Sequence, residues 1–264
     1  MNPISAIKSY LRPIRYQALK GKTILIYNAG KVGSRTLYFQ LHNTSPFDNV
    51  YHTHFLSKEW LERLKGTKYF DENWERANMV FNHLEKKPAE KRYIITLVRE
   101  PISREFSNYF QHPDDYVNGD IHSYSISEVV KRFYEILNFE YYFNWFDTEL
   151  RTYTGFDVFD CPFDKETGYT IYDHDELTKV LVIKLEKLND CYQEAIQKFL
   201  GIKLKFLVNA NEANQKDISS LYKEVKHKIR FTGTRLDEIY SHRFVTHFYS
   251  PAEIEKFKAK YCQD

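Results

Sequence analysis

The amino-acid sequence predicts an α/β protein: a P-loop-like parallel β-sheet flanked by helices, with further helices decorating its C-terminal end. Short apolar segments rich in β-branched residues alternate with longer segments of helical periodicity, and 42% of the 264 residues are hydrophobic. No internal repeat or low-complexity tract interrupts this alternation. Strands that alternate with helices form parallel sheets through right-handed crossovers. We therefore expect a single domain over residues 1–264, in which residues 1–20 form an N-terminal helical extension.

The expected elements follow the apolar pattern along the chain. The segment Tyr93 to Val98 is the most apolar strand candidate, and alternation predicts a half-buried strand near residues 49–55. Strands are expected at residues 23–28, 49–55, 93–98, 156–160, 169–173 and 179–185. Helices are expected at residues 34–43, 57–64, 72–85, 101–110, 125–137, 142–154, 188–200, 218–229, 235–242 and 251–261.

Local signals predict several helix boundaries. Pro101 suits the first position of a helix, where its missing N–H costs nothing. Ser125 and Glu128 have the spacing of a capping box. Gly155 and Gly201 are placed to end the helices before them.

Charge and composition exclude several classes of protein. Lys and Arg total 38 and Asp and Glu 36, and the net charge of +2 disfavours a general nucleic-acid-binding protein. The three cysteines lie too far apart for a zinc site and are odd in number, so we expect free thiols and a cytoplasmic location. The first 20 residues lack a continuous apolar stretch, and we expect no integral membrane segment.

The segment after the first strand has the composition of a phosphate-binding loop. Gly30 and Gly33 permit a tight turn with exposed N–H groups, and the start of the next helix adds a positive dipole end. Side-chain donors accompany them at Lys31, Ser34, Arg35 and Thr36. The nucleoside triphosphatase pattern does not fit, because Leu25 and Val32 stand where it requires Gly and Ser or Thr. A glycine-containing turn with incidental charges remains the alternative for this segment alone.

A second polar motif follows the most apolar strand. Arg99 comes directly after the strand, and a helix from Pro101 places Ser107 two turns further on, on the face opposite the apolar stripe. Arg99 and Ser107 could converge on one anionic ligand. The alternative is a helix with a solvated polar face.

Together the two motifs resemble the sulfotransferases that use 3′-phosphoadenosine 5′-phosphosulfate (PAPS). Residues 31–36 read K-x-G-S-x-T, and residues 99–109 read R-x-P-x-x-R-x-x-S-x-Y. Residues 144–150 and 155–158 are similar to the capsular polysaccharide synthesis branch of that superfamily. The resemblance implies a 5′-phosphosulfate loop formed by Lys31, Val32, Gly33, Ser34, Arg35 and Thr36, and a 3′-phosphate site formed by Arg99 and Ser107.

Some positions depart from the family pattern. Lys184 replaces the usual arginine of the late strand, which residues 180–188 resemble. The glycine-rich segment that completes the 3′-phosphate site in some members has no clear counterpart, and Thr232 to Arg235 is the candidate for it.

The implied reaction transfers a sulfuryl group from PAPS to a carbohydrate hydroxyl and releases 3′-phosphoadenosine 5′-phosphate (PAP). The acceptor hydroxyl must lose a proton, which requires a base. A histidine in such a strand is otherwise structural, but the resemblance assigns the base to His54, with His52 lining the site. His83 and Glu59 are weaker rivals. Lys31 would neutralise charge on the bridging oxygen as the nucleotide leaves.

No metal is expected in this reaction. Arg99 stands where a P-loop kinase would carry an acidic magnesium ligand, although Glu186 keeps the question open. Two other classes remain possible from the residues: a P-loop kinase-like phosphotransferase, and a non-catalytic nucleotide- or glycan-binding module on the same fold. Trp145 could serve either a sugar site or the core. The identity of the acceptor, the position sulfated and the oligomeric state cannot be read from the residues.

Overall fold

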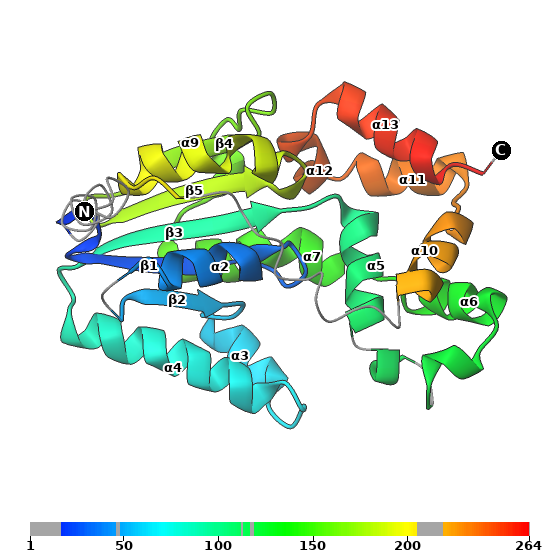
Figure 1. The fold of residues 1–264 in the computed structure, drawn as a ribbon, viewed down its shortest axis with the longest axis horizontal. Helices are drawn as coiled ribbons and strands as arrows, with labels where there is room; N and C mark the ends of the chain where they lie inside the picture. The colour runs from blue at the N-terminus through cyan, green and yellow to red at the C-terminus, as the bar shows by residue number, and fades with distance from the viewer. Residues whose placement is uncertain (1–16, 46–47, 112, 117–118, 205–218, 264) are drawn as a thin grey trace, which may run out of the picture.

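A five-stranded sheet in the order β2-β1-β3-β5-β4 forms the centre of the protein (Figure 1). The computed structural model describes residues 17–45, 48–111, 113–116, 119–204 and 219–263, so most of the expected extension at residues 1–20 lies outside it. The strands are β1 (Lys22–Tyr27), β2 (Val50–Thr53), β3 (Lys91–Val98), β4 (Tyr169–Asp173) and β5 (Thr178–Lys184). The predicted α/β fold is confirmed.

One edge of the sheet departs from the expected parallel arrangement. Strands β2, β1, β3 and β5 pair in parallel, whereas β4 pairs antiparallel to β5. The connection between β4 and β5 is a short turn in which the Asp175 carboxylate accepts hydrogen bonds from the backbone N–H groups of Leu177 and Thr178, both at 2.7 Å. So short a link can only reverse the chain, because a parallel pair needs a long crossover.

Helices surround the sheet, with α2 in front of it and α7 behind it in Figure 1. Helices α5, α6 and α10 gather beyond the carboxyl end of β3, and α11, α12 and α13 lie together at the C-terminal end. The helices are α2 (Ser34–His42), α3 (Lys58–Leu64), α4 (Phe70–Lys86), α5 (Pro101–Gln111), α6 (Ile126–Ile136), α7 (Glu140–Trp145), α8 (Thr152–Thr154), α9 (Leu188–Leu200), α10 (Ser219–Lys228), α11 (Gly233–Tyr240), α12 (Arg243–Phe248) and α13 (Pro251–Tyr261).

Most of the predicted helix boundaries are confirmed. Ser125 and Glu128 form the expected capping box at the start of α6, and Pro101 is the first residue of α5. Gly155 and Gly201 follow α8 and α9 with φ angles of 78° and 77°.

Three segments differ from the prediction, one of which is α12, a helix at a position where none was expected. The expected strand at residues 156–160 is a 3₁₀ turn, because the Asp157 side chain accepts a hydrogen bond from Phe159 N and caps the turn. The helix expected at residues 142–154 consists of α7, a π-helix (η3, Phe146–Arg151) and α8. A π-turn is uncommon and is found mostly at functional sites.

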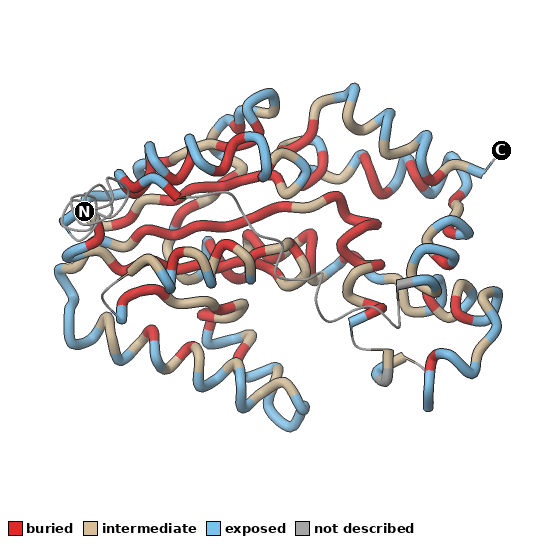
Figure 2. Tube along the Cα trace, in the orientation of Figure 1, coloured by how far each residue is buried: buried red, intermediate tan, exposed pale blue. Residues whose placement is uncertain are grey.

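The buried residues concentrate in the strands and in the helix faces next to them (Figure 2). In α5 the predicted apolar stripe of Ile102, Phe106, Tyr109 and Phe110 is buried. The alternative for the opposite face was a polar, solvated surface, yet Arg104 on that face is only 4% exposed. That face is covered because it packs against the loop after β1 and the C-terminal helices, as the contacts below show.

Candidate functional site

The loop between β1 and α2 has a left-handed backbone at two positions. Lys31 and Gly33 both have left-handed backbones, with φ angles of 71° and 81°. A Cβ atom on Gly33 would lie 2.6 Å from Leu185 Cδ1, so a larger residue would have to displace the Leu185 side chain as well as adopt a left-handed backbone. A lysine held at positive φ is a strained backbone, and such residues cluster at ligand sites.

The second motif meets this loop at the carboxyl edge of the sheet. Strands β1 and β3 are parallel neighbours, so their carboxyl ends lie side by side. Arg99 Nη1 donates a hydrogen bond to the Lys31 carbonyl at 2.9 Å, and Arg104 Nε donates one to the Gly30 carbonyl at 2.9 Å. Two segments about 70 residues apart in the sequence therefore form one site.

Positive charge is concentrated around the loop. Burial, then Arg104, then Arg35 lower the pKa of Lys31 to about 8. Glu105 forms an ion pair with Arg104. Positive charge concentrated at one place attracts an anionic ligand, and such a ligand beside Lys31 would raise its pKa towards the ordinary value.

A second group of cations surrounds Arg99, and the sequence did not indicate it. Burial, then Lys260, then Arg99 lower the pKa of Lys226 against the opposing charge of Glu100. Burial lowers the pKa of Lys260, where the charge of Glu100 opposes the shift and that of Arg99 adds to it. Lys260 Nζ donates hydrogen bonds to the Tyr261 hydroxyl at 2.9 Å and to Ser103 Oγ at 3.5 Å. Both lysines come from C-terminal helices, α10 and α13, and belong to no motif, so only the fold reveals them.

Two other parts of the predicted 3′-phosphate site, Ser107 and the segment from Thr232 to Arg235, lie on different helices. Ser107 is half-buried in α5, one helical turn after Ser103 and Arg104 and on the same face. Thr232 caps α11 by accepting a hydrogen bond from Arg235 N, and the Arg235 side chain pairs with Glu238. These contacts are those of a helix start, which does not decide the expectation that the segment completes a phosphate site, so that expectation stays a prediction.

His54 lies directly beyond the carboxyl end of β2 and is oriented by backbone groups. Its Nδ1 lies 2.8 Å from the Asn28 carbonyl, which can only accept, so Nδ1 carries the proton and Nε2 keeps its lone pair. Trp145 Nε1 donates a hydrogen bond to the His54 carbonyl at 3.2 Å. This geometry suits a general base, and Trp145 belongs to the core rather than to a sugar site.

Both histidines of this strand are neutral at pH 7. Burial, followed by the charges of Arg76, Lys31 and Arg104, lowers the pKa of His54 to about 4 against the opposing hydrogen bond to Asn28. Burial and the neighbouring His54 lower the pKa of His52 to about 2.

His52 links the strand to the start of α2. Its Nε2 lies 2.9 Å from Ser34 Oγ, and its ring stacks on Tyr38 at 5.4 Å between centroids. The His52 and His54 rings are 5.0 Å apart. Both therefore border the loop.

The two alternative candidates for the base, His83 and Glu59, lie away from the loop. His83 Nε2 contacts Thr23 Oγ1 at 3.0 Å and Glu90 at 2.7 Å, which places it at the amino end of β1, away from the loop. Glu59 is exposed and pairs with Arg63. Neither side chain has a contact with the candidate site.

A buried carboxylate, Glu149, supports the end of β2 from the π-helix. One of its oxygens accepts hydrogen bonds from the Tyr27 hydroxyl, from Leu56 N at 2.8 Å and from Ser57 N at 3.0 Å. Burial raises its pKa to about 7. No catalytic motif marks Glu149 in the sequence, yet it joins the strand end of β1 to the segment after His54.

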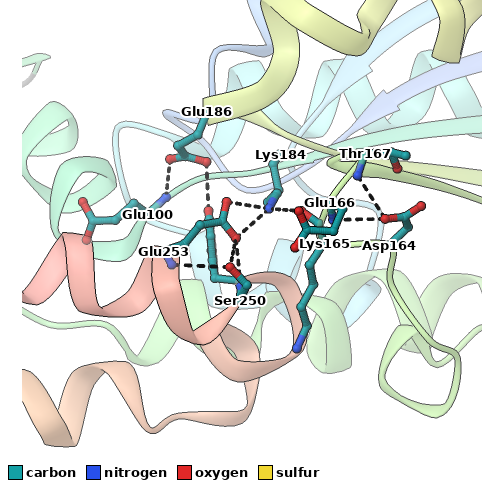
Figure 3. A network of polar contacts seen from close by, with 10 residues as sticks. Glu100, Asp164, Lys165, Glu166, Thr167, Lys184, Glu186, Ser250 and Glu253 are labelled. Carbon is teal, nitrogen blue, oxygen red and sulfur yellow. Dashed lines mark hydrogen bonds and ion pairs between the residues drawn. The ribbon is translucent and has the colours of Figure 1, made fainter.

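Polar contacts attach the C-terminal helices to the same edge of the sheet (Figure 3). Lys184 is fully buried, and its Nζ contacts the Glu253 carboxylate at 2.7 and 2.9 Å and the Lys165 carbonyl at 2.6 Å. Glu186 accepts hydrogen bonds from Glu100 N at 2.8 Å and from the Tyr249 hydroxyl at 3.0 Å. The lysine at position 184 is thus structural.

Glu100 completes this attachment directly behind Arg99. It caps α5 by accepting hydrogen bonds from Ile102 N at 2.7 Å and Ser103 N at 2.8 Å. The hydroxyls of Tyr240 and Tyr261 also donate to it, at 2.8 and 3.2 Å. The backbone of Arg99 itself is held by Tyr142, whose hydroxyl accepts a hydrogen bond from Arg99 N and donates one to the Arg99 carbonyl, both at 2.7 Å.

Comparison with known proteins finds a similarity to one family over part of the chain. Residues 125–250 match the NKWYS family, described as "Putative capsular polysaccharide synthesis protein". No curated protein and no solved structure matches. The matched segment contains α7, the π-helix and β5, but neither the loop after β1 nor Arg99. Over this segment the chain is similar to capsular polysaccharide synthesis proteins.

None of the helices in the described ranges has the length and apolarity needed to cross a bilayer.

Proposed function

We propose that this protein is a sulfotransferase that transfers a sulfuryl group from PAPS to a hydroxyl of a carbohydrate acceptor of the capsular polysaccharide type. The observation that carries the proposal is the junction of Arg99 with the Lys31 carbonyl, which joins two cationic motifs at neighbouring strand ends. The family match over residues 125–250 supports a role in polysaccharide synthesis.

The arrangement of charge fits a nucleotide that carries anionic groups at two separate places. Lys31 lies in the loop and Arg104 lies beside it, whereas Lys226 and Lys260 lie beside Arg99. We assign the 5′-phosphosulfate to the first group and the 3′-phosphate to the second. A nucleoside triphosphate concentrates its charge in one chain and normally requires a metal-binding acid after the strand, a position that Arg99 occupies here.

The side chains can perform the two tasks that sulfuryl transfer demands. PAPS, when bound, supplies the sulfuryl group, whose sulfur gains a bond to the acceptor oxygen as its bond to the 5′-phosphate oxygen breaks. His54 Nε2 takes the proton of the acceptor hydroxyl, while the Asn28 carbonyl holds the opposite nitrogen in place. The Lys31 ammonium stabilises the negative charge that develops on the phosphate oxygen. Positioning and charge stabilisation supply most of the catalysis in such transfers.

Nucleotide binding tests the proposal directly. Calorimetric titration with PAP should give saturable heat, and PAP should raise the melting temperature. Arg99→Ala and Ser107→Ala should weaken binding by at least tenfold, whereas Arg63→Ala, which removes an exposed guanidinium paired with Glu59, should not change it. Absence of heat with both PAP and PAPS would overturn the proposal.

A non-catalytic nucleotide-binding module is the second candidate, and the low pKa values of both histidines favour it. Transfer of labelled sulfate from PAPS to a panel of polysaccharides separates the two. Binding of PAP without transfer to any acceptor would support the module.

A further inference from the structure

A groove of about 510 Å³ opens between α2, β2 and α4, and one end of it adjoins the loop after β1. His52 and Arg35 connect the two features. His52 lines the groove and contacts Ser34, the first residue of α2, while Arg35 follows Ser34 and also lines the groove. A ligand in this groove would therefore end beside the loop and the two histidines.

The walls of the groove carry large apolar side chains that are exposed to solvent. Phe39 on α2 is 43% exposed, and Met79 on α4 is 60% exposed. Tyr38 adds an aromatic ring that stacks on His52 with an interplanar angle of 23°. Exposed apolar surface in a hollow of this size marks a binding site, and flat rings suit the apolar faces of sugar rings.

Two guanidinium groups stand at the end of the groove nearest the loop. Arg35 lies over the Phe39 ring at 5.9 Å, and Arg76 projects from α4. Both lie close enough to His52 to lower its pKa. The acidic groups nearby are Asp48, which lines the groove, and Glu72, an exposed residue that pairs with Arg76. Surface pairs of this kind are weak, so Arg76 remains able to bind another anion.

We propose that this groove binds the acceptor and that the acceptor is an anionic saccharide, with a sugar ring against Phe39 and Met79 and its acidic group between Arg35 and Arg76. Arginine binds carboxylate and phosphate groups through two parallel hydrogen bonds, which also orients the ligand. This inference rests on the proposed function, because it names the substrate class of the same site.

Binding of defined saccharides tests the inference. The probes are a tetrasaccharide of alternating glucuronate and N-acetylglucosamine, its carboxyl-reduced neutral form, and a tetrasaccharide linked by phosphodiesters. At least one anionic probe should bind tenfold or more tightly than the neutral form, and added salt should weaken that binding. The stronger of the two anionic probes identifies the acidic group as a carboxylate or a phosphate.

Variants locate the binding in the groove. Arg76→Gln and Phe39→Ala should each reduce affinity for the anionic probe by about tenfold or more, while PAP binding is retained. Arg63→Gln is the matched control, because Arg63 forms a similar exposed i,i+4 pair but lies on α3, outside the groove lining. Equal binding of anionic and neutral probes, no binding of any probe, or unchanged affinity in Arg76→Gln would overturn the inference.

The outcome also distinguishes this inference from the proposed function. PAP binding without preference for anionic saccharides removes the acceptor assignment alone. Saccharide binding that depends on Arg76, without any binding of PAP or PAPS, leaves the groove in place and removes the sulfotransferase.

Discussion

The hydrogen bond between His54 and the Asn28 carbonyl determines which ring nitrogen can accept a proton. The carbonyl cannot donate, so the imidazole must carry its hydrogen on Nδ1 and present the lone pair of Nε2. His52 differs, because its Nε2 is engaged with Ser34 Oγ. The two histidines therefore have separable roles although they lie two residues apart.

Replacing His54 should slow turnover strongly without changing the affinity for the nucleotide. His54→Ala is expected to lower kcat by about 10²- to 10⁴-fold, the usual contribution of a general base, and to leave the Kd for PAP unchanged. Steady-state assays with PAPS and calorimetry with PAP check both parts. His122→Ala, at an exposed position on a 3₁₀ turn, is the control, and full activity of His54→Ala would remove the assignment.

The pH dependence of kcat should differ from that of kcat/KM, because the bound anion changes the pKa of His54. The base works only when neutral, so activity falls as the pH drops through the pKa of His54, which is about 4 in the unliganded protein. Bound phosphosulfate offsets the charges of Lys31 and Arg104, which raises that pKa. The acid limb of kcat should consequently lie at higher pH than that of kcat/KM, which reports the free enzyme.

Glu149 should make stability depend on pH in a direction unusual for a carboxylate. Burial raises its pKa from 4.5 to about 7, so the folded protein holds a proton that the unfolded chain releases. Stability conferred by that proton is present below pH 4.5 and is lost as the pH rises to about 7, at most about 3 kcal/mol.

The isosteric variant Glu149→Gln isolates this effect. Between pH 5 and 8 the melting temperature of the wild-type protein should fall relative to that of Glu149→Gln, which has no titrating group at this position. Parallel melting curves over the whole range would show that Glu149 stays ionised in the folded protein.

Some residues of the site could be predicted from the sequence and others could not, for a physical reason. Lys31, Arg99 and Ser107 lie within short motifs at strand ends, where local spacing indicates an anion site. Lys226 and Lys260 approach Arg99 only because two C-terminal helices pack there. Glu149 and its partners are similarly brought together by tertiary packing, for which a sequence has no periodic signal.

At the scale of the elements, the loop before α2 packs closely against the residue that follows β5. Gly33 has a left-handed backbone and lies against Leu185, which follows β5 directly. The end of β5 and the start of α2 therefore shape the loop together, although they are far apart in the sequence.

A pair of glycine substitutions separates crowding from backbone strain. Gly33 and Gly66 have nearly the same φ, 81° and 80°, but a Cβ on Gly66 would meet nothing within 4 Å. Gly66→Ala should cost about 1 kcal/mol from the backbone alone, and Gly33→Ala clearly more, together with a weaker affinity for PAP. Urea denaturation and calorimetry measure the two effects, and equal losses of stability would show that the crowding against Leu185 adds nothing to the backbone strain.

The element boundaries were predictable where a single residue type determines them. Capping at Ser125 and termination at Gly155 and Gly201 rely on local hydrogen bonds and φ angles. The π-helix and the antiparallel direction of β4 were not predictable in this way. The first arises within a run of ordinary helical periodicity, and the second depends on how few residues remain between β4 and β5.

At the scale of the whole molecule, the ion pair of Lys184 with Glu253 fastens the C-terminal helices to the sheet (Figure 3). The partners are unequally buried: the Lys184 side chain is fully buried, whereas that of Glu253 is 22% exposed and also accepts a hydrogen bond from Ser250 N at 2.8 Å. A lysine left without its partner would thus be less well solvated than the glutamate.

Substitution of the two partners should reflect this asymmetry. Glu253→Gln should destabilise the protein by about 3 kcal/mol or more, because it leaves a buried charge, and Lys184→Met should cost less. The double variant should lose less stability than the sum of the single ones. Urea denaturation gives these values, and loss of the exposed Arg235–Glu238 pair, expected to cost under about 1 kcal/mol, is the control. An additive double variant would refute the coupling.

The order of strands in the sheet also has a kinetic consequence. Strand β3 pairs with β5 so that Val98 meets Lys184, and each parallel pair joins segments separated by a helical crossover. Among the strands described, β4 and β5 form the one pair that a tight turn brings together. Closing the long crossovers costs chain entropy before their contacts form. The anion loop, built on β1 and β3, therefore depends on the slow, non-local steps of folding rather than on its own short sequence.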